Sequence, residues 1–180
     1  MNGKIIEHAG TQKYRVTSPQ VAYLMTNMLQ TVAESGTGAS SRSGYYWESA
    51  GKTGTSNQNN DSWYIGFNKA YTLGIWTGFD NRSLKVGSAL AASVWGPIMT
   101  KAIRIDNNGR NPKANDSRYS FVEPPRISHL RVNPYTGFVV RGGGISEIFI
   151  EGNEPVVSRD SLSYNYPPGY GFQDQFEQDL

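Results

Sequence analysis

The chain has 180 residues, no cysteine and a formal net charge of +2. This length suits one domain or a piece of a larger one, and the small net charge, without blocks of like charge, predicts no nucleic-acid partner. The lack of cysteine excludes disulfides, thiolate metal sites and thiol nucleophiles. No apolar run approaches the roughly 20 residues of a membrane helix, and the N-terminus lacks a signal-peptide core. We therefore expect any membrane anchor to lie upstream of Met1.

In chain order, residues 4–7 and 13–17 are short strand candidates, and a helix follows them. Ser18 can cap this helix, Pro19 suits its first turn, and Gly36 is a suitable stop. Its apolar residues recur at helical spacing: Val21, Leu24, Met25, Met28, Leu29 and Val32. The sequence therefore predicts one amphipathic helix near the start of the chain.

A mobile loop is predicted next at residues 37–44, which are small and polar, and a series of strands comes after it. The third of these strands places Gly74, Trp76 and Gly78 on one face, where the glycines leave room for a closely packed element. We expect a second helix to pack there. The predicted strands cover roughly residues 47–56, 62–68 and 71–79, joined by turns at 58–61 and 68–69.

The second helix is predicted over about residues 88–104. Gly96-Pro97 should bend it, because proline removes a helical hydrogen bond and clashes with the preceding turn. In the C-terminal third, residues 127–132 and 137–141 predict a hairpin, and residues 146–150 a further strand. The composition suggests four regions: a main domain at 1–105, a polar linker at 106–120, a small β-rich extension at 121–155 and a disordered tail at 156–180.

The segment Lys52-Thr53-Gly54-Thr55 carries the chemistry of the chain. In a strand, Thr53 and Thr55 share one face and Lys52 and Gly54 the other, so a site that uses both sets lies along the edge of the strand. An open edge can accept an extended peptide as a further strand. The ammonium and hydroxyl groups suit a carboxylate, and the Thr55 N–H suits an oxyanion. An exposed polar strand that leads into a turn is the alternative.

With its surroundings, this segment resembles the third active-site motif of the penicillin-binding proteins, in the form found in their class A (bifunctional) enzymes. The resemblance implies an α/β fold of the α+β type: the C-terminal part of a transpeptidase domain like that of the serine β-lactamases, with antiparallel strands packed with helices. Residues 1–105 would be that part. The similar segments are Thr17–Met25, Gly36–Gly38, Ala50–Phe67, Leu73–Asp80, Ala91–Met99 and, more loosely, Glu147–Pro155.

The resemblance also implies a function: a fragment of a peptidoglycan DD-transpeptidase, which cross-links stem peptides by serine acyl transfer. Its partners would be the D-Ala-D-Ala stem peptide and β-lactams, at the extracytoplasmic face of the bacterial cell membrane, with no cofactor and no metal. Lys52 and Thr55 would be catalytic, and Thr53, Gly54 and Thr55 would bind the substrate. Trp63 would either support this site from the next strand or be a core aromatic residue.

The serine nucleophile of the family, in S-x-x-K, and its S-x-N motif both precede the third motif, and the residues before Lys52 contain neither. Ser49-Ala50-Gly51-Lys52 matches S-x-x-K by letter, but positions three apart in a strand face opposite sides. Ser163-Tyr164-Asn165 matches S-x-N but follows the third motif. We therefore expect the isolated chain to be inactive, and its partner to be the missing N-terminal part of the same protein.

Other patterns are weaker. Gly51-Lys52-Thr53 could end a phosphate-binding loop, but Tyr46 stands where that loop needs a small residue, and no helix is predicted to follow. His8 and His129 stand alone, without ligand spacing. The aromatic run 45–47 predicts a strand packed on the core. Two rival functions stay open: a non-catalytic module that binds peptidoglycan or penicillin, and part of a β-lactamase or penicillin sensor of the same superfamily.

Overall fold

The computed structural model describes residues 10, 12–56, 60–79, 87 and 89–155. The chain divides into two compact units, residues 1–125 and 126–180, and each is described by itself. The strand candidate at 4–7 and the expected tail at 156–180 lie outside the described residues.

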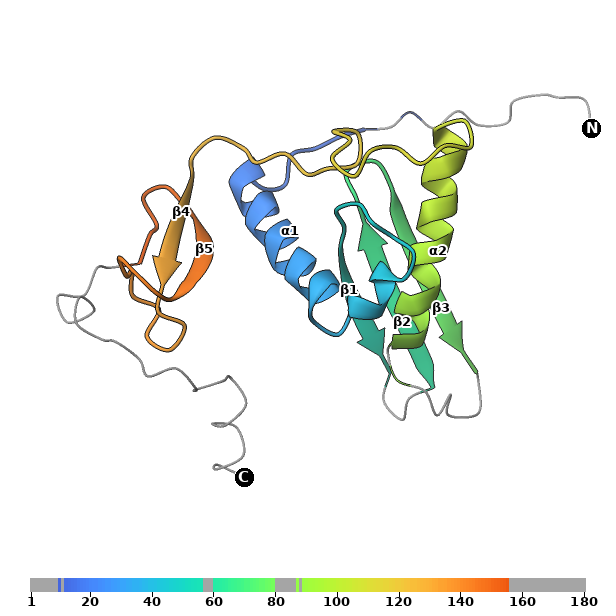
Figure 1. The fold of residues 1–180 in the computed structure, drawn as a ribbon, viewed down its shortest axis with the longest axis horizontal. Coiled ribbons are helices and arrows are strands. Elements are labelled where there is room, and N and C mark those ends of the chain that lie inside the picture. The colour runs from blue at the N-terminus through green and yellow to red at the C-terminus, as the bar shows by residue number, and fades with distance from the viewer. Residues whose placement is uncertain (1–9, 11, 57–59, 80–86, 88, 156–180) are drawn as a thin grey trace, which may run out of the picture. The chain divides into compact units, whose positions relative to one another are not determined.

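Among its described residues, the first unit contains two helices, a short 3-10 turn and a three-stranded antiparallel sheet (Figure 1). Its elements are α1 (Pro19–Glu34), η1 (Ala39–Arg42), β1 (Ala50–Thr55), β2 (Asp61–Phe67), β3 (Thr72–Gly78) and α2 (Ala89–Asp106). The second unit contains β4 (Ile127–Val132) and β5 (Ile145–Ile150).

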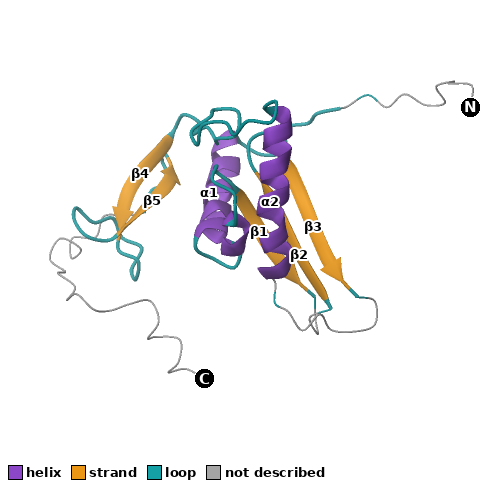
Figure 2. Ribbon diagram, turned by 45° about the vertical axis from the view of Figure 1, so that its right-hand side comes forward, coloured by secondary structure: helices purple, strands orange, loops and turns teal. Residues whose placement is uncertain are grey.

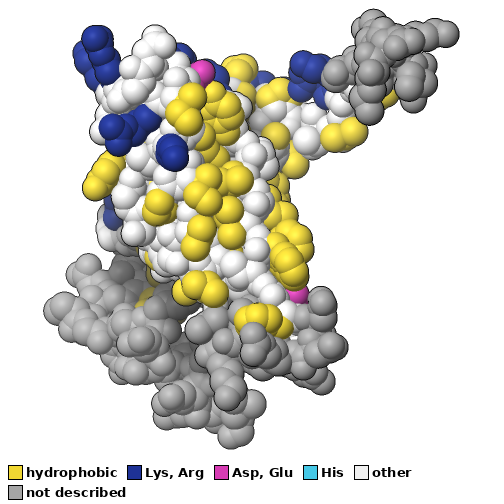
Figure 3. Space-filling view, turned by 90° about the vertical axis from the view of Figure 1, so that its right-hand side faces the viewer, with side chains coloured by type: hydrophobic (Ala, Val, Ile, Leu, Met, Phe, Trp, Pro, Cys, Tyr) yellow, Lys and Arg dark blue, Asp and Glu magenta, His cyan; other side chains and the backbone are white. Residues whose placement is uncertain are grey.

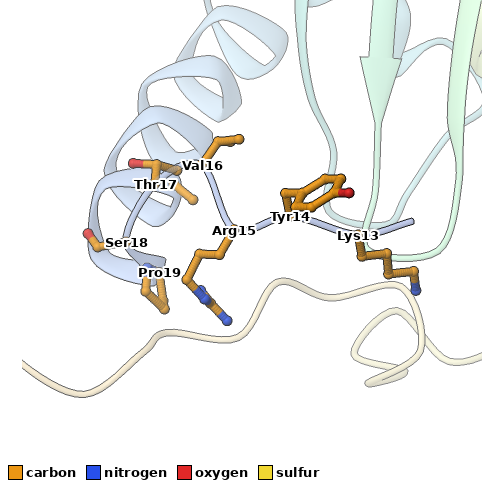
Figure 4. A pocket seen from close by; sticks show the side chains of 8 residues that line it. Lys13, Tyr14, Arg15, Val16, Thr17, Ser18 and Pro19 are labelled. Atoms are coloured by element: carbon orange, nitrogen blue, oxygen red, sulfur yellow. The ribbon is translucent and has the colours of Figure 1, made fainter. Parts of the chain in front are cut away.

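Helix α1 begins where the sequence predicts. The Ser18 hydroxyl accepts a hydrogen bond from the Val21 N–H at 3.2 Å, which satisfies one of the N–H groups that the first turn leaves open, and Pro19 occupies the first turn. The strand candidate 13–17 forms no strand. Its side chains alternate, with Lys13 and Arg15 on one side of the segment and Tyr14 and Val16 on the other, along a groove that also reaches α1 (Figure 4).

The sheet has the order β1-β2-β3, so β1 and β3 are its edges. The register places Thr53 opposite Tyr64, and Tyr64 opposite Ile75. These three side chains share the face that the helices cover, with α1 packed against β1 and α2 against β2 and β3 (Figure 2). The core of the unit lies between this face and α2.

The expectation that α2 packs on the Gly74, Trp76 and Gly78 face of β3 is wrong. Helix α2 covers the opposite face, where Leu73 and Ile75 contact the core. The glycine that makes close packing possible is Gly66 on β2, since a Cβ there would stand 2.8 Å from the Trp95 indole. The Trp95 Nε1 donates to the carbonyls of Gly66 at 3.3 Å and Leu73 at 3.1 Å, which fastens α2 to both strands.

Within the segment 37–44, which was predicted as a loop, residues 39–42 form η1 and Ser41 is fully buried. The turn packs against α2 at Gly96, where a Cβ would stand 2.5 Å from the Ser43 carbonyl oxygen. Gly96 therefore serves helix packing. Pro97, the expected site of a bend, lies inside α2.

Tyr45 and Trp47 are core residues, as predicted, but they lie in a loop before β1 rather than in a strand. The Arg42 guanidinium holds this loop by donating to the Trp47 carbonyl at 2.7 Å. The segment 106–120 adds Tyr119 to the same core, and the Trp47 Nε1 donates to the Lys113 carbonyl at 3.1 Å. This segment, predicted as a polar linker, therefore contributes a buried tyrosine and a hydrogen bond to the core of the first unit.

Helix α2 ends with exposed basic side chains. Lys101 and Arg104 lie in its last turns, where positive charge complements the partial negative charge of a helix C-terminus. Figure 3 shows Lys and Arg side chains gathered at the upper end of this side of the molecule, and apolar side chains along its middle. No helix among the described residues is long and apolar enough to cross a membrane.

In the second unit, the long ladder of β4 forms with a different strand from the one predicted. Strand β4 pairs with β5 in antiparallel register, from Ile127 opposite Ile150 to Val132 opposite Ile145. Residues 137–141 form no extended strand, but they do fold back on the end of β4: Val139 bridges Val132, the Asn133 N–H donates to the Phe138 carbonyl, and the Val140 N–H donates to the Arg131 carbonyl, both at 2.9 Å. The further strand at 146–150 is confirmed, and it takes the place that the sequence assigned to 137–141.

Candidate functional site

The candidate site lies on β1, at an edge of the sheet. Lys52 and Thr55 are exposed, whereas Thr53 retains only 9% of its exposure and faces the helices. Gly54 lies beside Trp63 in the register. Within the part of the chain that the structure describes, no strand pairs with the outer side of β1. The structure thus brings the four predicted site residues to an open strand edge.

Backbone directions along this edge follow from one hydrogen bond just past the end of β1. The Ser56 N–H donates to the Asp61 carbonyl at 3.3 Å, so Ser56 directs its N–H toward β2. Because successive residues of an antiparallel strand direct their backbone groups to alternate sides, Thr53 and Thr55 direct theirs away from β2. The Thr55 N–H and the Thr53 carbonyl therefore face the open edge.

The Lys52 ammonium lies at the same edge. Its side chain starts on the face that carries Trp63, and the Nζ donates to the Thr53 carbonyl at 3.0 Å. The ammonium has three N–H donors, so two remain for other acceptors. A positive charge held beside outward backbone groups can attract a negatively charged ligand to this edge.

The Thr53 hydroxyl makes a contact that sequence reasoning missed. Its Oγ1 lies 2.8 Å from the Oγ1 of Thr37, which is exposed in the loop between α1 and η1. The sequence signal was available in Gly36-Thr37-Gly38, but the motif alone assigns no role to the threonine between the glycines.

Behind β1, Tyr64 supports the strand from the core. Its hydroxyl donates to the Ser41 hydroxyl at 3.0 Å, and burial raises its pKa above the usual value. A Cβ on Gly51 would stand 2.6 Å from the Tyr64 Cζ. Gly51 thus lets the buried tyrosine pack directly beneath the β1 backbone, and a larger residue there would displace the strand.

Trp63 is not a core residue. Trp63, Ile65 and Trp76 are 44%, 51% and 50% exposed and share the face of the sheet opposite the helices. The Trp76 Nε1 donates to Asp61 at 2.9 Å. Hydrogen bonds from Ser56 and Trp76 hold the pKa of the Asp61 carboxyl below its usual range. An aromatic pair and an ionised carboxylate therefore lie next to the end of β1.

The described residues give no support to the weaker sequence patterns, namely the S-x-x-K match, the phosphate-binding loop and a histidine metal site. Ser49 is buried and its hydroxyl has no hydrogen-bond partner among the described residues, whereas Lys52 is exposed and donates to a carbonyl, so the two do not form a nucleophile and base. Residues 51–53 lie inside strand β1, and the next described element is strand β2 rather than a helix, which excludes a phosphate-binding loop. His129 is exposed on β4, and no cluster of metal-ligating side chains occurs among the described residues. His8 and Ser163 lie outside them.

Comparison with known proteins places the chain in a family. Residues 4–100 match the family model described as the penicillin binding protein transpeptidase domain. The chain is 40% identical over 162 residues to penicillin-binding protein 1A of Clostridium botulinum, covering 85% of this chain and 19% of that protein. It is 33% identical over 131 residues to penicillin-binding protein 1A of Pseudomonas aeruginosa, covering 71% of this chain and 15% of that protein.

The fold is similar as well. A crystal structure of penicillin-binding protein 1A from Haemophilus influenzae matches with a TM-score of 0.63 and 28% identity, over 79% of this chain and 22% of that chain. The mixed α+β fold expected from the sequence, with antiparallel strands and helices, is therefore confirmed. The chain spans less than a quarter of the length of each of these relatives.

Proposed function

Because this chain belongs to the family of penicillin-binding protein transpeptidase domains, we propose that it is part of a peptidoglycan DD-transpeptidase of the bifunctional type. The observation that carries the proposal is the open edge of β1. There, the Lys52 ammonium, the Thr53 carbonyl and the Thr55 N–H lie together. These groups match the needs of an extended peptide that ends in a carboxylate.

The edge would work by strand addition. A stem peptide ending in D-Ala-D-Ala aligns along β1 and hydrogen-bonds with the outward backbone groups of Thr53 and Thr55. The Lys52 ammonium and the threonine hydroxyls bind its terminal carboxylate through charge-assisted hydrogen bonds. The Thr55 N–H stabilises the oxyanion that forms at the reacting carbonyl, a contribution worth about 10²–10³ in rate. β-Lactams would occupy the same edge.

The reaction itself needs a serine, which we place outside these 180 residues. The serine oxygen attacks the carbonyl between the two D-alanines, an ester forms, and the terminal D-Ala leaves. An acceptor amine then attacks the ester, an amide forms, and the serine is released. The buried Ser49 is unsuitable, since no base among the described residues hydrogen-bonds with its hydroxyl. The coverage of less than a quarter of each relative supports a partner segment that carries the nucleophile.

We place the complete enzyme at the extracytoplasmic face of the bacterial cell membrane, where peptidoglycan lies, with any membrane anchor in the partner segment. A non-catalytic peptidoglycan-binding module, or part of a β-lactamase or sensor, would use the same edge. The match to three proteins named penicillin-binding protein 1A favours the transpeptidase.

A fluorescent penicillin tests whether the serine nucleophile lies outside these 180 residues. We expect the isolated chain to bind it reversibly and to form no covalent adduct that survives denaturing electrophoresis. A stable adduct would show that a nucleophile lies within these residues and would contradict the proposal. The complete gene product, assayed in parallel, should form the adduct. Peptidoglycan binding without acylation in that product would favour the non-catalytic module.

A further inference from the structure

The side chain of Thr53 is nearly buried, so its hydroxyl needs a fixed orientation to donate to a ligand at the strand edge. Thr53 is 9% exposed, and its Oγ1 lies 2.8 Å from the Thr37 Oγ1. Thr37 is exposed and belongs to another part of the chain, 16 residues earlier. The two hydroxyls together reach from the interior to the surface beside β1.

The backbone around Thr37 is held on both sides. The Gly36 N–H donates to the Thr31 carbonyl at 3.2 Å, and the Gly38 N–H to the Val32 carbonyl at 3.0 Å. A Cβ on Gly36 would stand 2.9 Å from the Val32 Cα, and one on Gly38 would stand 3.0 Å from the Tyr64 ring. The end of α1 and the core therefore fix the loop, and the position of the Thr37 hydroxyl relative to β1 is set by the fold.

A hydrogen bond between two hydroxyls uses one of their two hydrogens. The other hydrogen stays available, and the hydroxyl that accepts is polarised into a better donor. When Thr37 donates to Thr53, the Thr53 hydrogen must point to another acceptor, and its rotation is restricted. A single fixed hydroxyl donor on the residue whose carbonyl accepts from the Lys52 ammonium suits one oxygen of a carboxylate.

We infer that Thr37 is a positioning residue for the carboxylate site: it orients the Thr53 hydroxyl toward the terminal carboxylate of a ligand on β1. The inference rests on the proposed function and adds a residue from outside the Lys52–Thr55 strand. Thr37 acts through Thr53 and does not need to touch the reacting atoms.

The test is the preference of the chain for a carboxylate. N-acetyl-D-Ala-D-Ala and its C-terminal carboxamide are titrated into the 180-residue protein, and both affinities are measured by NMR chemical shifts. We expect wild type to prefer the carboxylate. T37V should lower that preference about tenfold, the scale of one hydrogen bond to a charged group, and T37S should restore it to within about twofold. T53V should lower it at least as much as T37V.

The matched control is T26V, which removes a threonine hydroxyl that donates to the Ala22 carbonyl within α1, and it should keep the wild-type preference. Circular dichroism checks the fold of every variant, and T37A replaces T37V if the valine variant fails to fold. If T53V loses the preference while T37V keeps it, the role of Thr37 is overturned and the proposed carboxylate site stands. If folded wild type shows no preference, the carboxylate site and the role of Thr37 both fall.

Discussion

Tyr64 joins the core to the candidate site through one hydroxyl. It donates to the buried Ser41 hydroxyl, and its ring lies beneath Gly51 of β1. Tyr64→Phe would leave the Ser41 hydroxyl buried without this partner, so we expect a loss of about 1–2 kcal/mol in the free energy of unfolding. Urea denaturation measures it. Tyr46→Phe is the control, because Tyr46 is 71% exposed and should change stability by less than about 0.5 kcal/mol.

Lys52 is the charged residue of the edge, and its removal should weaken binding of an anionic ligand. We expect Lys52→Gln to lower the affinity for N-acetyl-D-Ala-D-Ala about tenfold at low ionic strength, the scale of one charge-assisted hydrogen bond, and added salt to narrow the difference. Isothermal titration calorimetry measures both affinities. Lys101→Gln removes the same charge from an exposed position on α2, and this variant should bind the ligand as tightly as wild type does. Equal losses of affinity in the two variants would show that net charge, rather than the position of Lys52, controls binding, and would contradict the prediction.

At the scale of elements, the contact between η1 and α2 depends on one glycine. Alanine favours a helix interior over glycine by up to about 1 kcal/mol, yet a Cβ at Gly96 would collide with carbonyl oxygens of the 41–43 segment. We expect the collision to dominate and Gly96→Ala to lower the melting temperature by several degrees. Gly142→Ala, with open space for its Cβ, should leave it nearly unchanged. A more stable Gly96→Ala variant would contradict the close packing.

The segment after α2 contains an acid-sensitive contact. Hydrogen bonds from Arg118 lower the pKa of the Asp116 carboxyl to about 2. Since an unfolded chain titrates this carboxyl near pH 4, the stabilisation is fully present above that pH and is lost as the pH falls toward 2. We expect Asp116→Asn to melt below wild type at pH 6, with the gap closing by pH 2. Thermal melts across this pH range provide the check.

The sequence predicted the elements better than their packing. Cap, proline and periodicity located α1, and alternation placed Lys52 and Thr53 on opposite faces of β1. The face of β3 that receives α2 was predicted wrongly, because the choice depends on space above Gly66 in the neighbouring strand. The contact between Thr37 and Thr53 could not be predicted from the sequence either, because it too depends on tertiary packing. It joins two segments whose spacing is set only by the packed helix and sheet.

At the scale of the whole molecule, the aromatic core lies entirely within the first unit, whose last core residue is Tyr119. We therefore expect a chain that ends at Pro125 to keep one cooperative unfolding transition, within a few degrees of the corresponding transition of the 180-residue chain. Differential scanning calorimetry tests this. Loss of the transition in the shortened chain would show that residues 126–180 are needed for the first unit to fold.

The open sheet face has an optical consequence. The chain has four tryptophans. Trp47 and Trp95 are buried, while Trp63 and Trp76 are half-exposed, with ring centroids 6.2 Å apart. Iodide in solution should quench emission from the exposed pair and spare the buried pair. Any polypeptide that covers this face of the sheet would shift the emission of the exposed pair to shorter wavelength and shield it from iodide, so the protein's own fluorescence reports whether its outer face is covered.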